Sequence, residues 1–334
     1  MDRNDIFAMP KVELHVHLEG AIRPATLMHL AAKNGVDLTP KTLEEFDKWY
    51  EFVDFPHFAQ VFQASSKCIQ SAEDVHRITV DFLDGQAEQN IIHTEATYTA
   101  FTHYKNSGIP FDEQIGAIRG AAHAANARHG ITLGVVVDIA RGMVSDKEAM
   151  QTAQWVADCH GDGLVVALGL GGYEKPHPAE NYVAPFEFAR EAGVPAVVHA
   201  GETGGPESIR AAVEKLNAVR VGHCVTALED FSVISLLGER GIVLEVCPTS
   251  NLCIGVADRI ESHALPHLLE AGLKVTIGTD DPPIFNTTLV DEYQKVTDAF
   301  GYGRDQLIEF NRVAVEAALI AESRRAELRA AVCD

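Results

Sequence analysis

Basic residues are scarce in this chain of 334 residues: 27 Lys and Arg stand against 48 Asp and Glu, a formal net charge of −21 at pH 7. Such a charge repels phosphate backbones and anionic head groups, so we expect neither a nucleic acid nor a membrane as partner. No apolar run reaches the roughly 20 residues of a membrane-spanning helix, and the first residues lack the apolar stretch of a secretory signal. We predict a cytoplasmic protein with a small-molecule partner.

Paired cysteines and glycine-rich phosphate turns are also missing. The six cysteines are scattered without a C-x-x-C pair, which argues against a disulfide framework and a cysteine-rich zinc site. Neither G-x-G-x-x-G nor a Walker motif occurs, which disfavours a doubly wound nucleotide-binding sheet. Any chemistry must therefore come from other side chains.

What the chain does contain is an alternation of short β-branched, apolar runs with longer stretches of helical periodicity. Such alternation predicts βα units around a parallel sheet, and eight runs predict an α/β fold, the (β/α)8 or TIM barrel, as one domain over residues 1–334. The predicted strands cover residues 12–18, 91–97, 131–138, 164–170, 194–199, 219–223, 242–246 and 273–279, and the clearest helices cover 111–129, 146–159, 207–217 and 228–240.

One connection is too long for a minimal barrel. About 70 residues separate the first two predicted strands, where one helix and its turns need far fewer. We predict a helical insertion, with residues 37–67 as a cap over the barrel mouth and Phe55 and Phe58 as candidates for substrate contact. The alternative is that its aromatic side chains are ordinary helix core. These side chains are Phe46, Trp49, Tyr50, Phe52, Phe55, Phe58 and Phe62.

The first predicted strand carries two histidines two positions apart, in the run Val-Glu-Leu-His-Val-His over residues 12–17. Because strand side chains alternate between faces, Glu13, His15 and His17 would all face the barrel interior. Imidazoles so spaced can bind one metal ion. A hydrogen-bonded core pair is the alternative for the two histidines alone.

Polar residues also follow three later strands, where barrel enzymes carry their active sites. The fifth run ends at His199 and is followed by Glu202, and the sixth ends at His223. Asp280 and Asp281 follow the eighth. The barrel would bring these side chains together with those of the first strand, which strengthens the prediction of a metal site.

These motifs, in this order, resemble the adenosine deaminase branch of the amidohydrolase superfamily. The resemblance rests on Pro-Lys-Val-Glu-Leu-His-Val-His-Leu-Glu-Gly at 10–20, His-Ala-Gly-Glu at 199–202, Gly-His at 222–223, Cys-Pro-Thr-Ser-Asn at 247–251 and Thr-Asp-Asp-Pro at 279–282.

The resemblance implies one zinc ion per chain. Three imidazoles and one carboxylate leave an open coordination position, and zinc lowers the pKa of a bound water to about 7. A second metal would call for a bridging carboxylate or carboxylated Lys after the fourth strand, and no Lys occurs there before Lys175. The implied ligands are His15, His17, His199 and Asp280.

The resemblance also implies roles around a purine. Glu202 would protonate ring nitrogen N1, and His223 would orient and deprotonate the attacking water. Asp281 would hydrogen-bond to N7, and the backbone at Gly172 would contact N3. Hydroxide attack on C6 needs a proton at N1, and a buried carboxyl group with a raised pKa can donate it. The alternative for Glu202 is a carboxylate that caps the following helix.

Two positions depart from the nucleoside enzymes of this branch. Gly169 stands where those enzymes typically have Asp. Glu19 also stands at a position where they typically have Asp, and there the Asp contacts the ribose. The Leu-Gly-Gly run over residues 170–172 is closer to relatives that deaminate a 5′-modified adenosine.

We therefore predict zinc-dependent hydrolytic deamination of a 6-aminopurine nucleoside, either adenosine or a modified one such as 6-amino-6-deoxyfutalosine. The alternatives are deamination of free adenine, hydrolysis of an amide at a mononuclear site, and a non-catalytic zinc- or nucleoside-binding protein. Relatives acting on adenine share the Glu after H-x-H but tend to carry Ser-Ser before the fourth-strand Glu, which this chain lacks. The sequence leaves the oligomeric state open.

Overall fold

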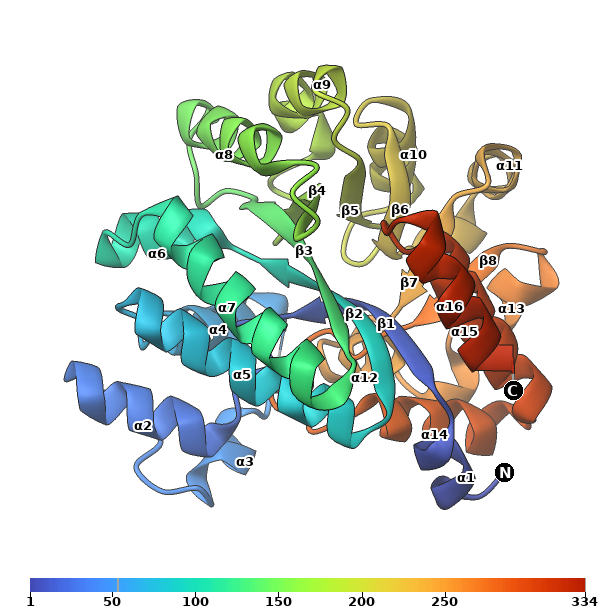
Figure 1. Cartoon of the computed structure of the whole chain (residues 1–334). Helices are drawn as coiled ribbons and strands as arrows, with labels where there is room; N and C mark the ends of the chain where they lie inside the picture. The colour runs from blue at the N-terminus through green and yellow to red at the C-terminus, as the bar shows by residue number, and fades with distance from the viewer. Residues whose placement is uncertain (53, 334) are drawn as a thin grey trace.

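Eight parallel strands form the centre of the molecule (Figure 1). The computed structural model describes residues 1–52 and 54–333, so Val53 of the predicted cap and Asp334 of the predicted domain lie outside the described residues. Each strand pairs with the next along the chain. They are β1 (Lys11–His17), β2 (Ile91–Tyr98), β3 (Thr132–Ala140), β4 (Val165–Gly171), β5 (Ala196–Ala200), β6 (Ala218–His223), β7 (Val243–Val246) and β8 (Lys274–Ile277).

The sheet closes on itself between its first and last strands. Val16 of β1 forms a parallel bridge with Asp280, which follows β8. The His17 N–H donates to the Asp280 carbonyl at 2.7 Å, and the Asp280 N–H donates to the His15 carbonyl at 3.1 Å. The predicted (β/α)8 barrel is thus confirmed, and every predicted strand overlaps an observed one.

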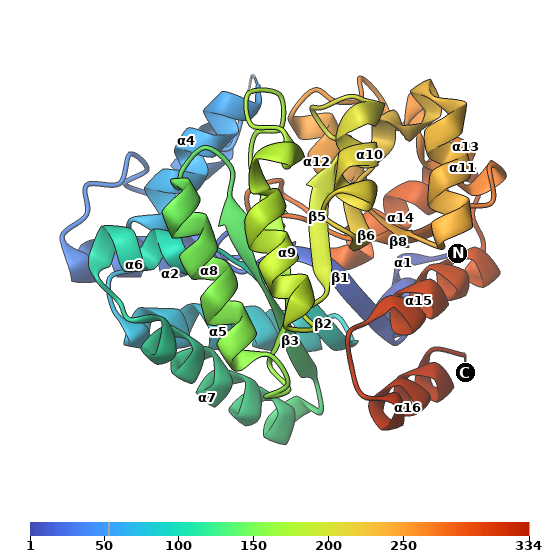
Figure 2. The same ribbon diagram turned by 90° about the horizontal axis from the view of Figure 1, so that it is seen from above.

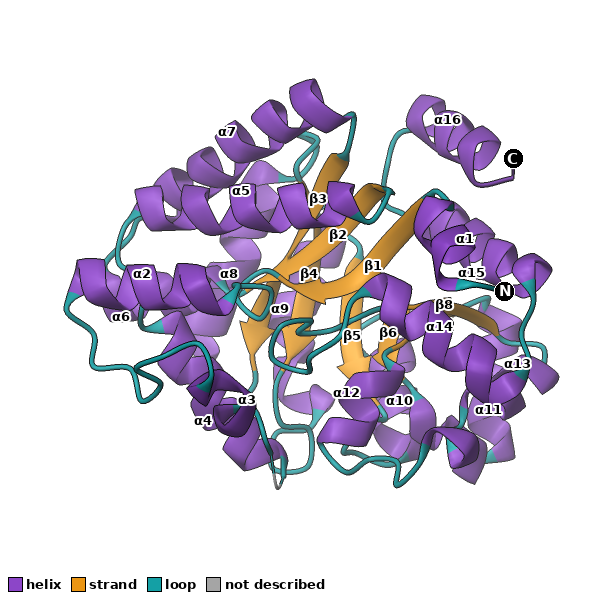
Figure 3. Cartoon of the chain, turned by 90° about the horizontal axis from the view of Figure 1, so that it is seen from below, coloured by secondary structure: helices purple, strands orange, loops and turns teal. Residues whose placement is uncertain are grey.

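Helices surround the strands on the outside of the barrel (Figures 2 and 3). None in the described part of the chain is long and apolar enough to cross a membrane. The α-helices are α1 (Arg3–Ala8), α2 (Pro24–Asn34), α3 (Glu45–Trp49), α4 (Phe55–Ser66), α5 (Ala72–Glu88), α6 (Ala100–Ser107), α7 (Phe111–His129), α8 (Asp146–Cys159), α9 (Val183–Glu191), α10 (Pro206–Glu214), α11 (Phe231–Arg240), α12 (Pro248–Cys253), α13 (Leu265–Glu270), α14 (Leu289–Phe300), α15 (Arg304–Ala317) and α16 (Glu322–Cys333), and the 3-10 helices are η1 (Ala179–Tyr182), η2 (Val225–Glu229) and η3 (Ile260–Ser262).

Two of the predicted helices, α7 and α8, have the predicted bounds, and two differ. The predicted helix over 228–240 is divided at Asp230, whose side chain accepts the Ser232 N–H at 2.8 Å and so caps α11. The predicted helix over 207–217 ends at Glu214, because β6 already begins at Ala218.

β1 presents its apolar side chains to the outer helices and its polar side chains to the interior, as its alternation predicted. Val12 and Leu14 pack with Val315 of α15 and Leu328 of α16. Glu13 is buried on the opposite face. The two histidines of this strand therefore also point into the barrel.

The long connection between β1 and β2 holds α2 to α5, and α3 and α4 fall within the predicted cap. Phe46 of α3 is 2% exposed and belongs to the main core, as the helix-core alternative expected. Phe55 and Phe58 of α4 gather instead against Ile284 and Phe285, just after β8. α4 is therefore the part of the insertion that packs at the barrel mouth, beside the segment that carries Asp280.

Candidate active site

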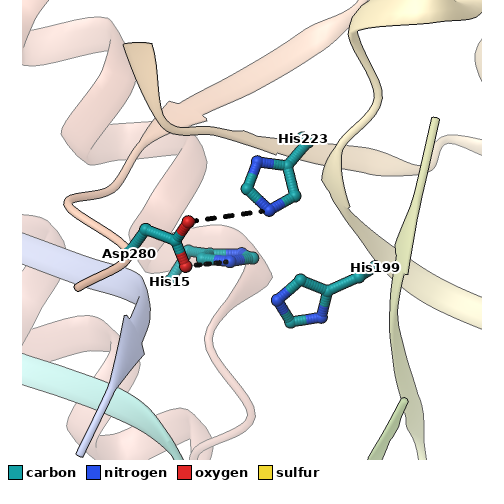
Figure 4. A group of neighbouring side chains, drawn as sticks. All are labelled: His15, His199, His223 and Asp280. Carbon is teal, nitrogen blue, oxygen red and sulfur yellow. Dashed lines mark ion pairs between the residues drawn. The ribbon is translucent and has the colours of Figure 1, made fainter. Parts of the chain in front are cut away.

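Four polar side chains meet at the carboxyl ends of the strands (Figure 4). His15 comes from β1, His199 from β5, His223 from the end of β6, and Asp280 from the segment after β8. One ligand atom from each lies within 4.8 Å of the others. Ligands about 2 Å from a common centre lie at most about 4 Å apart, so a small inward shift of these side chains would let the group hold one zinc-sized ion.

His17 lies at the edge of the same group. Its Nε2 is 3.0 Å from His199 Nε2 and 3.3 Å from Asp280 Oδ1. The structure therefore brings together all four predicted ligands, and also places His223 Nε2 near them, 3.9 Å from Asp280 Oδ2. Distance alone does not choose between His17 and His223 as the fourth ligand.

The Nδ1 atoms of two imidazoles have partners outside the group, so the Nε2 atoms of both rings are turned toward the other candidate ligands. His15 Nδ1 lies 2.9 Å from Glu245 Oε2, and His199 Nδ1 lies 3.2 Å from the Leu170 carbonyl. Among the described residues no partner hydrogen-bonds to His15 Nε2, although this atom is buried. A ring that donates from one nitrogen and leaves the other unpartnered is the usual arrangement of a metal ligand. The donor set therefore fits a metal ion.

A chain of hydrogen bonds fixes the proton on His223. Burial lowers the pKa values of His223 and His263 to about 4, so both rings are neutral at pH 7. The Leu265 N–H donates to His263 Nδ1 at 3.1 Å, which leaves the proton of His263 on Nε2, 3.1 Å from Asn251 Oδ1. The Asn251 amide nitrogen then faces His223 Nδ1 at 3.3 Å, so the proton of His223 is on Nε2. A protonated nitrogen donates and does not bind a metal, which favours His17 as the fourth ligand.

The loop after β5 is held by one buried carboxylate. Glu174 accepts the N–H groups of residues 201–204 at 2.8 to 3.1 Å and also the Ser208 hydroxyl. This loop carries Glu202, which is 6% exposed. Burial, with the charges of Asp280 and Glu174, raises the pKa of Glu202 well above its usual value and so favours the protonated carboxyl group.

The two adjacent aspartates after β8 have opposite electrostatic states. Burial opposes ionisation of Asp280, but the imidazoles of His15 and His17, whose Nε2 atoms lie 3.5 and 3.3 Å from Asp280 Oδ1, outweigh it and hold its pKa well below the usual value. Burial and the neighbouring Asp280 charge raise the pKa of Asp281 well above normal. Gly20 is needed here, because a Cβ at this position would lie 1.6 Å from Asp281 Oδ1.

A cavity of about 260 Å³ opens beside the polar group. Phe55 and Phe58 line it from α4, and Gly172 lines it from the end of β4. Glu202 and Asp281 line it as well. These five predicted catalytic or substrate-binding residues, from four different parts of the chain, thus face one space large enough for a small ligand.

Glu19 is placed differently from the other predicted residues. Its Oε1 accepts the Thr99 N–H at 2.9 Å and lies 3.0 Å from His103 Nε2. The described residues that line the cavity include Thr99 and do not include Glu19. In this arrangement Glu19 supports the start of α6, and its contact with a ribose stays a prediction.

Several residues of the site could not be singled out from the sequence. Glu245 and Glu174 act on predicted residues through side-chain contacts between strands or loops, and no local pattern marks such contacts. Asn251 stood in the Cys-Pro-Thr-Ser-Asn motif, but the sequence assigned it no role. Asp138 and Arg141 also line the cavity, at the end of β3 and just beyond it. Their one sequence signal was their place at a strand end.

A family model described as Adenosine deaminase matches residues 10–334. The chain belongs to the adenosine deaminase family. An adenine deaminase of Rhizobium etli is 35% identical over 322 residues, which cover 96% of this chain and 98% of that protein. An aminodeoxyfutalosine deaminase of Acidothermus cellulolyticus is 34% identical over 299 residues, 87% of this chain and 83% of that protein.

Two solved structures share the fold over nearly the whole chain. An adenine deaminase from Arthrobacter aurescens has a TM-score of 0.92 at 25% identity and covers 98% of both chains. An amidohydrolase from Burkholderia ambifaria with bound Zn has a TM-score of 0.91 at 26% identity, over 99% of this chain and 91% of that one. The protein is therefore a hydrolytic deaminase of adenine-like purines, from a metal-dependent family, with a site of three histidines and an aspartate.

Proposed function

We propose that this deaminase uses one zinc ion to convert a 6-aminopurine nucleoside into the 6-oxopurine product and ammonia. The observation that carries the proposal is a single cavity lined by the candidate ligands His17, His199 and Asp280, by Asp281 and by Glu202, whose raised pKa favours the protonated form. An amide substrate would need no donor for a ring nitrogen, so Glu202 and Asp281 argue against an amidase.

His15, His17, His199 and Asp280 would hold the ion. When bound, zinc supplies an activated water at neutral pH. Asp280 would be kept in place by the Ser250 hydroxyl, which donates to its Oδ2 at 2.7 Å. The low pKa of Asp280 suits this task, because a ligating carboxylate must be ionised.

The remaining polar side chains would act on the purine. Glu202 would give its proton to N1 as attack at C6 disrupts the aromatic ring. His223, protonated on Nε2, would donate a hydrogen bond to the attacking oxygen and so orient it. In that tautomer Nε2 already carries a proton and cannot accept one from the water. The predicted role of His223 as base would therefore require the tautomer with the proton on Nδ1. Asp281, protonated, would donate to N7.

A nucleoside is favoured by the part of the cavity that lies beyond the reacting groups. Thr99, Thr102 and Asp138 line it on the side of β2 and β3, and Arg141 follows β3. A free base would leave the buried Oδ1 of Asp138 without a partner, whereas a hydroxylated substituent on N9 could donate to it. The aminodeoxyfutalosine deaminase among the relatives fits a nucleoside substrate as well.

Free adenine is the second candidate, because the relatives named adenine deaminase reach 35% identity over nearly the full length of this chain. A panel of adenosine, deoxyadenosine, adenine, methylthioadenosine and aminodeoxyfutalosine, ranked by kcat/KM from ammonia release, separates the two. If kcat/KM is by far the highest for adenine, the substrate is the free base and not a nucleoside. A zinc-loaded protein that releases ammonia from none of the five would contradict the proposed function. A cytoplasmic location stays a prediction.

Glu202→Gln tests the proton donor directly. The variant should keep its zinc, because Glu202 is outside the proposed ligand set, and lose the great majority of kcat. Zinc content and kcat are the two measurements, and Glu207→Gln on the exposed start of α10 is the matched control. Activity within about tenfold of the unchanged enzyme would show that Glu202 is not the acid.

A further inference from the structure

Asp138, near the carboxyl end of β3, is a buried carboxylate that the deamination chemistry does not use. Its exposed fraction is 3%, and it lines the cavity. No described residue hydrogen-bonds to its Oδ1, which is fully buried. A buried oxygen without a donor costs free energy, so a ligand that supplies a donor would recover it.

Two glycines of β4 leave the space that this carboxylate fills. Asp138 pairs in register with Gly169, and a Cβ at Gly169 would lie 2.8 Å from the Asp138 Cβ. A Cβ at Gly171 would lie 2.7 Å from Asp138 Oδ2 and 3.7 Å from the His199 ring. The carboxylate therefore occupies the wall between β3 and β4, next to the polar group of the site.

The order of the strands around the barrel indicates which part of a purine Asp138 would meet. In the proposed function, Glu202 after β5 faces N1, Gly172 after β4 faces N3, and Asp281 after β8 faces N7. N9 lies between N3 and N7 on the perimeter of a purine. The N9 edge must then face the arc from β1 to β3, where Thr99 and Asp138 line the cavity.

The two sides of the cavity differ in polarity. α4 contributes Phe55, Phe58 and Phe62, which suit the faces of a base. The arc at β2 and β3 contributes the hydroxyl groups of Thr99 and Thr102 together with Asp138. An ionised carboxylate only accepts hydrogen bonds, so its partner on the N9 substituent must be a donor such as a sugar hydroxyl.

We propose, on the basis of the proposed function, that Asp138 is a specificity-determining residue whose Oδ1 accepts a hydrogen bond from a ring hydroxyl of the N9 substituent. Deamination at C6 does not involve this contact. It selects ribonucleosides over purines that lack the hydroxyl.

The test compares Asp138→Asn and Asp138→Ala with the unchanged holoenzyme on adenosine, 2′-deoxyadenosine, 3′-deoxyadenosine and adenine. For adenosine, kcat/KM of Asp138→Ala should fall roughly 10- to 100-fold, mainly through KM, since a hydrogen bond to a charged group is lost. The fall should be smaller in Asp138→Asn, because its amide oxygen still accepts a hydrogen bond but carries no charge. One of the two deoxynucleosides, the one that lacks the bonded hydroxyl, should be unaffected by either substitution, and so should adenine. Asp146→Asn, on the exposed first residue of α8, is the matched control.

Zinc content and the melting temperature of each variant are measured alongside, and Asp138→Asn, which preserves the shape, covers the case that Asp138→Ala does not fold. Equal losses on all four substrates, a selective loss on adenine, or no loss on adenosine would each overturn the assignment of Asp138. Failure of the proposed function is a separate result, because the unchanged enzyme would then release ammonia from none of the aminopurines.

Discussion

The hydrogen bond between His15 Nδ1 and Glu245 Oε2, 2.9 Å long, determines which nitrogen of His15 is available to a metal. Glu245 itself is fixed by Arg220, whose Nε lies 2.6 Å from Glu245 Oε1, and Arg220 also pairs with Glu95 at 2.6 Å. All of these groups are buried. The orientation of one ligand thus depends on a charge network at the centre of the barrel.

We predict that Glu245→Gln weakens zinc binding by about 10- to 100-fold, because an amide holds the imidazole less firmly than a carboxylate does. Residual zinc after dialysis against a graded series of a chelator measures the change. Glu239→Gln on the exposed surface of α11 is the control. Equal zinc retention in the two variants would mean that Glu245 does not support the site.

At the residue scale, the sequence predicted the groups that stand at strand ends and missed those that act across strands. His15, His199 and Asp280 could be found because a barrel brings all strand ends together. Glu245 and Asp138 could not, since the importance of each depends on the side chain opposite to it in the closed barrel. Pairing of β3 with β4, and closure of β1 against β8, have no local signature.

At the scale of elements, α4 links the inserted segment to the chemistry. Phe58 of α4 stacks on Phe285 with ring centroids 5.2 Å apart and planes 22° apart. Phe55 stacks on Tyr173, which directly follows Gly172, at 5.1 Å and 17°. The spacing of the first two strands predicted the insertion and its aromatic residues predicted an apolar cap, but neither could tell Phe46, which is core, from Phe58, which lines the cavity. We propose that residues 37–67 act as a cap through α4.

Phe58→Ala tests the cap. Loss of the ring removes both a stacked pair and one wall of the cavity, so kcat/KM for the preferred aminopurine should fall roughly tenfold. The fall should come from a higher KM and not from a lower kcat, because Phe58 is not among the groups that transfer protons. Steady-state kinetics measure it, with Phe231→Ala as control, since Phe231 is 80% exposed. A loss confined to kcat would contradict a role in binding.

At the scale of the whole molecule, the net charge of −21 bears on the choice between nucleosides and nucleotides. Of the carboxyl groups that line the cavity, Asp280 is held ionised and adds to this negative field, whereas the raised pKa values of Glu202 and Asp281 favour their neutral forms. Among the described residues that line it, the one Lys or Arg is Arg141, whose guanidinium is engaged by the carbonyls of His177 and His199. Little cationic charge is thus available to a phosphate.

We therefore predict that kcat/KM for AMP is at least about tenfold below that for adenosine at low salt. Added salt should narrow the gap, because the Debye length falls from about 30 Å at 0.01 M to about 10 Å at 0.1 M and screens the surface charges. Adenosine, which is uncharged, serves as its own control across the salt series. Equal kcat/KM values for AMP and adenosine at low salt would show that the negative charge of the protein does not weaken binding of the phosphate-bearing substrate. A gap that salt leaves unchanged would assign the discrimination to the buried carboxylates of the cavity rather than to the field of the whole molecule.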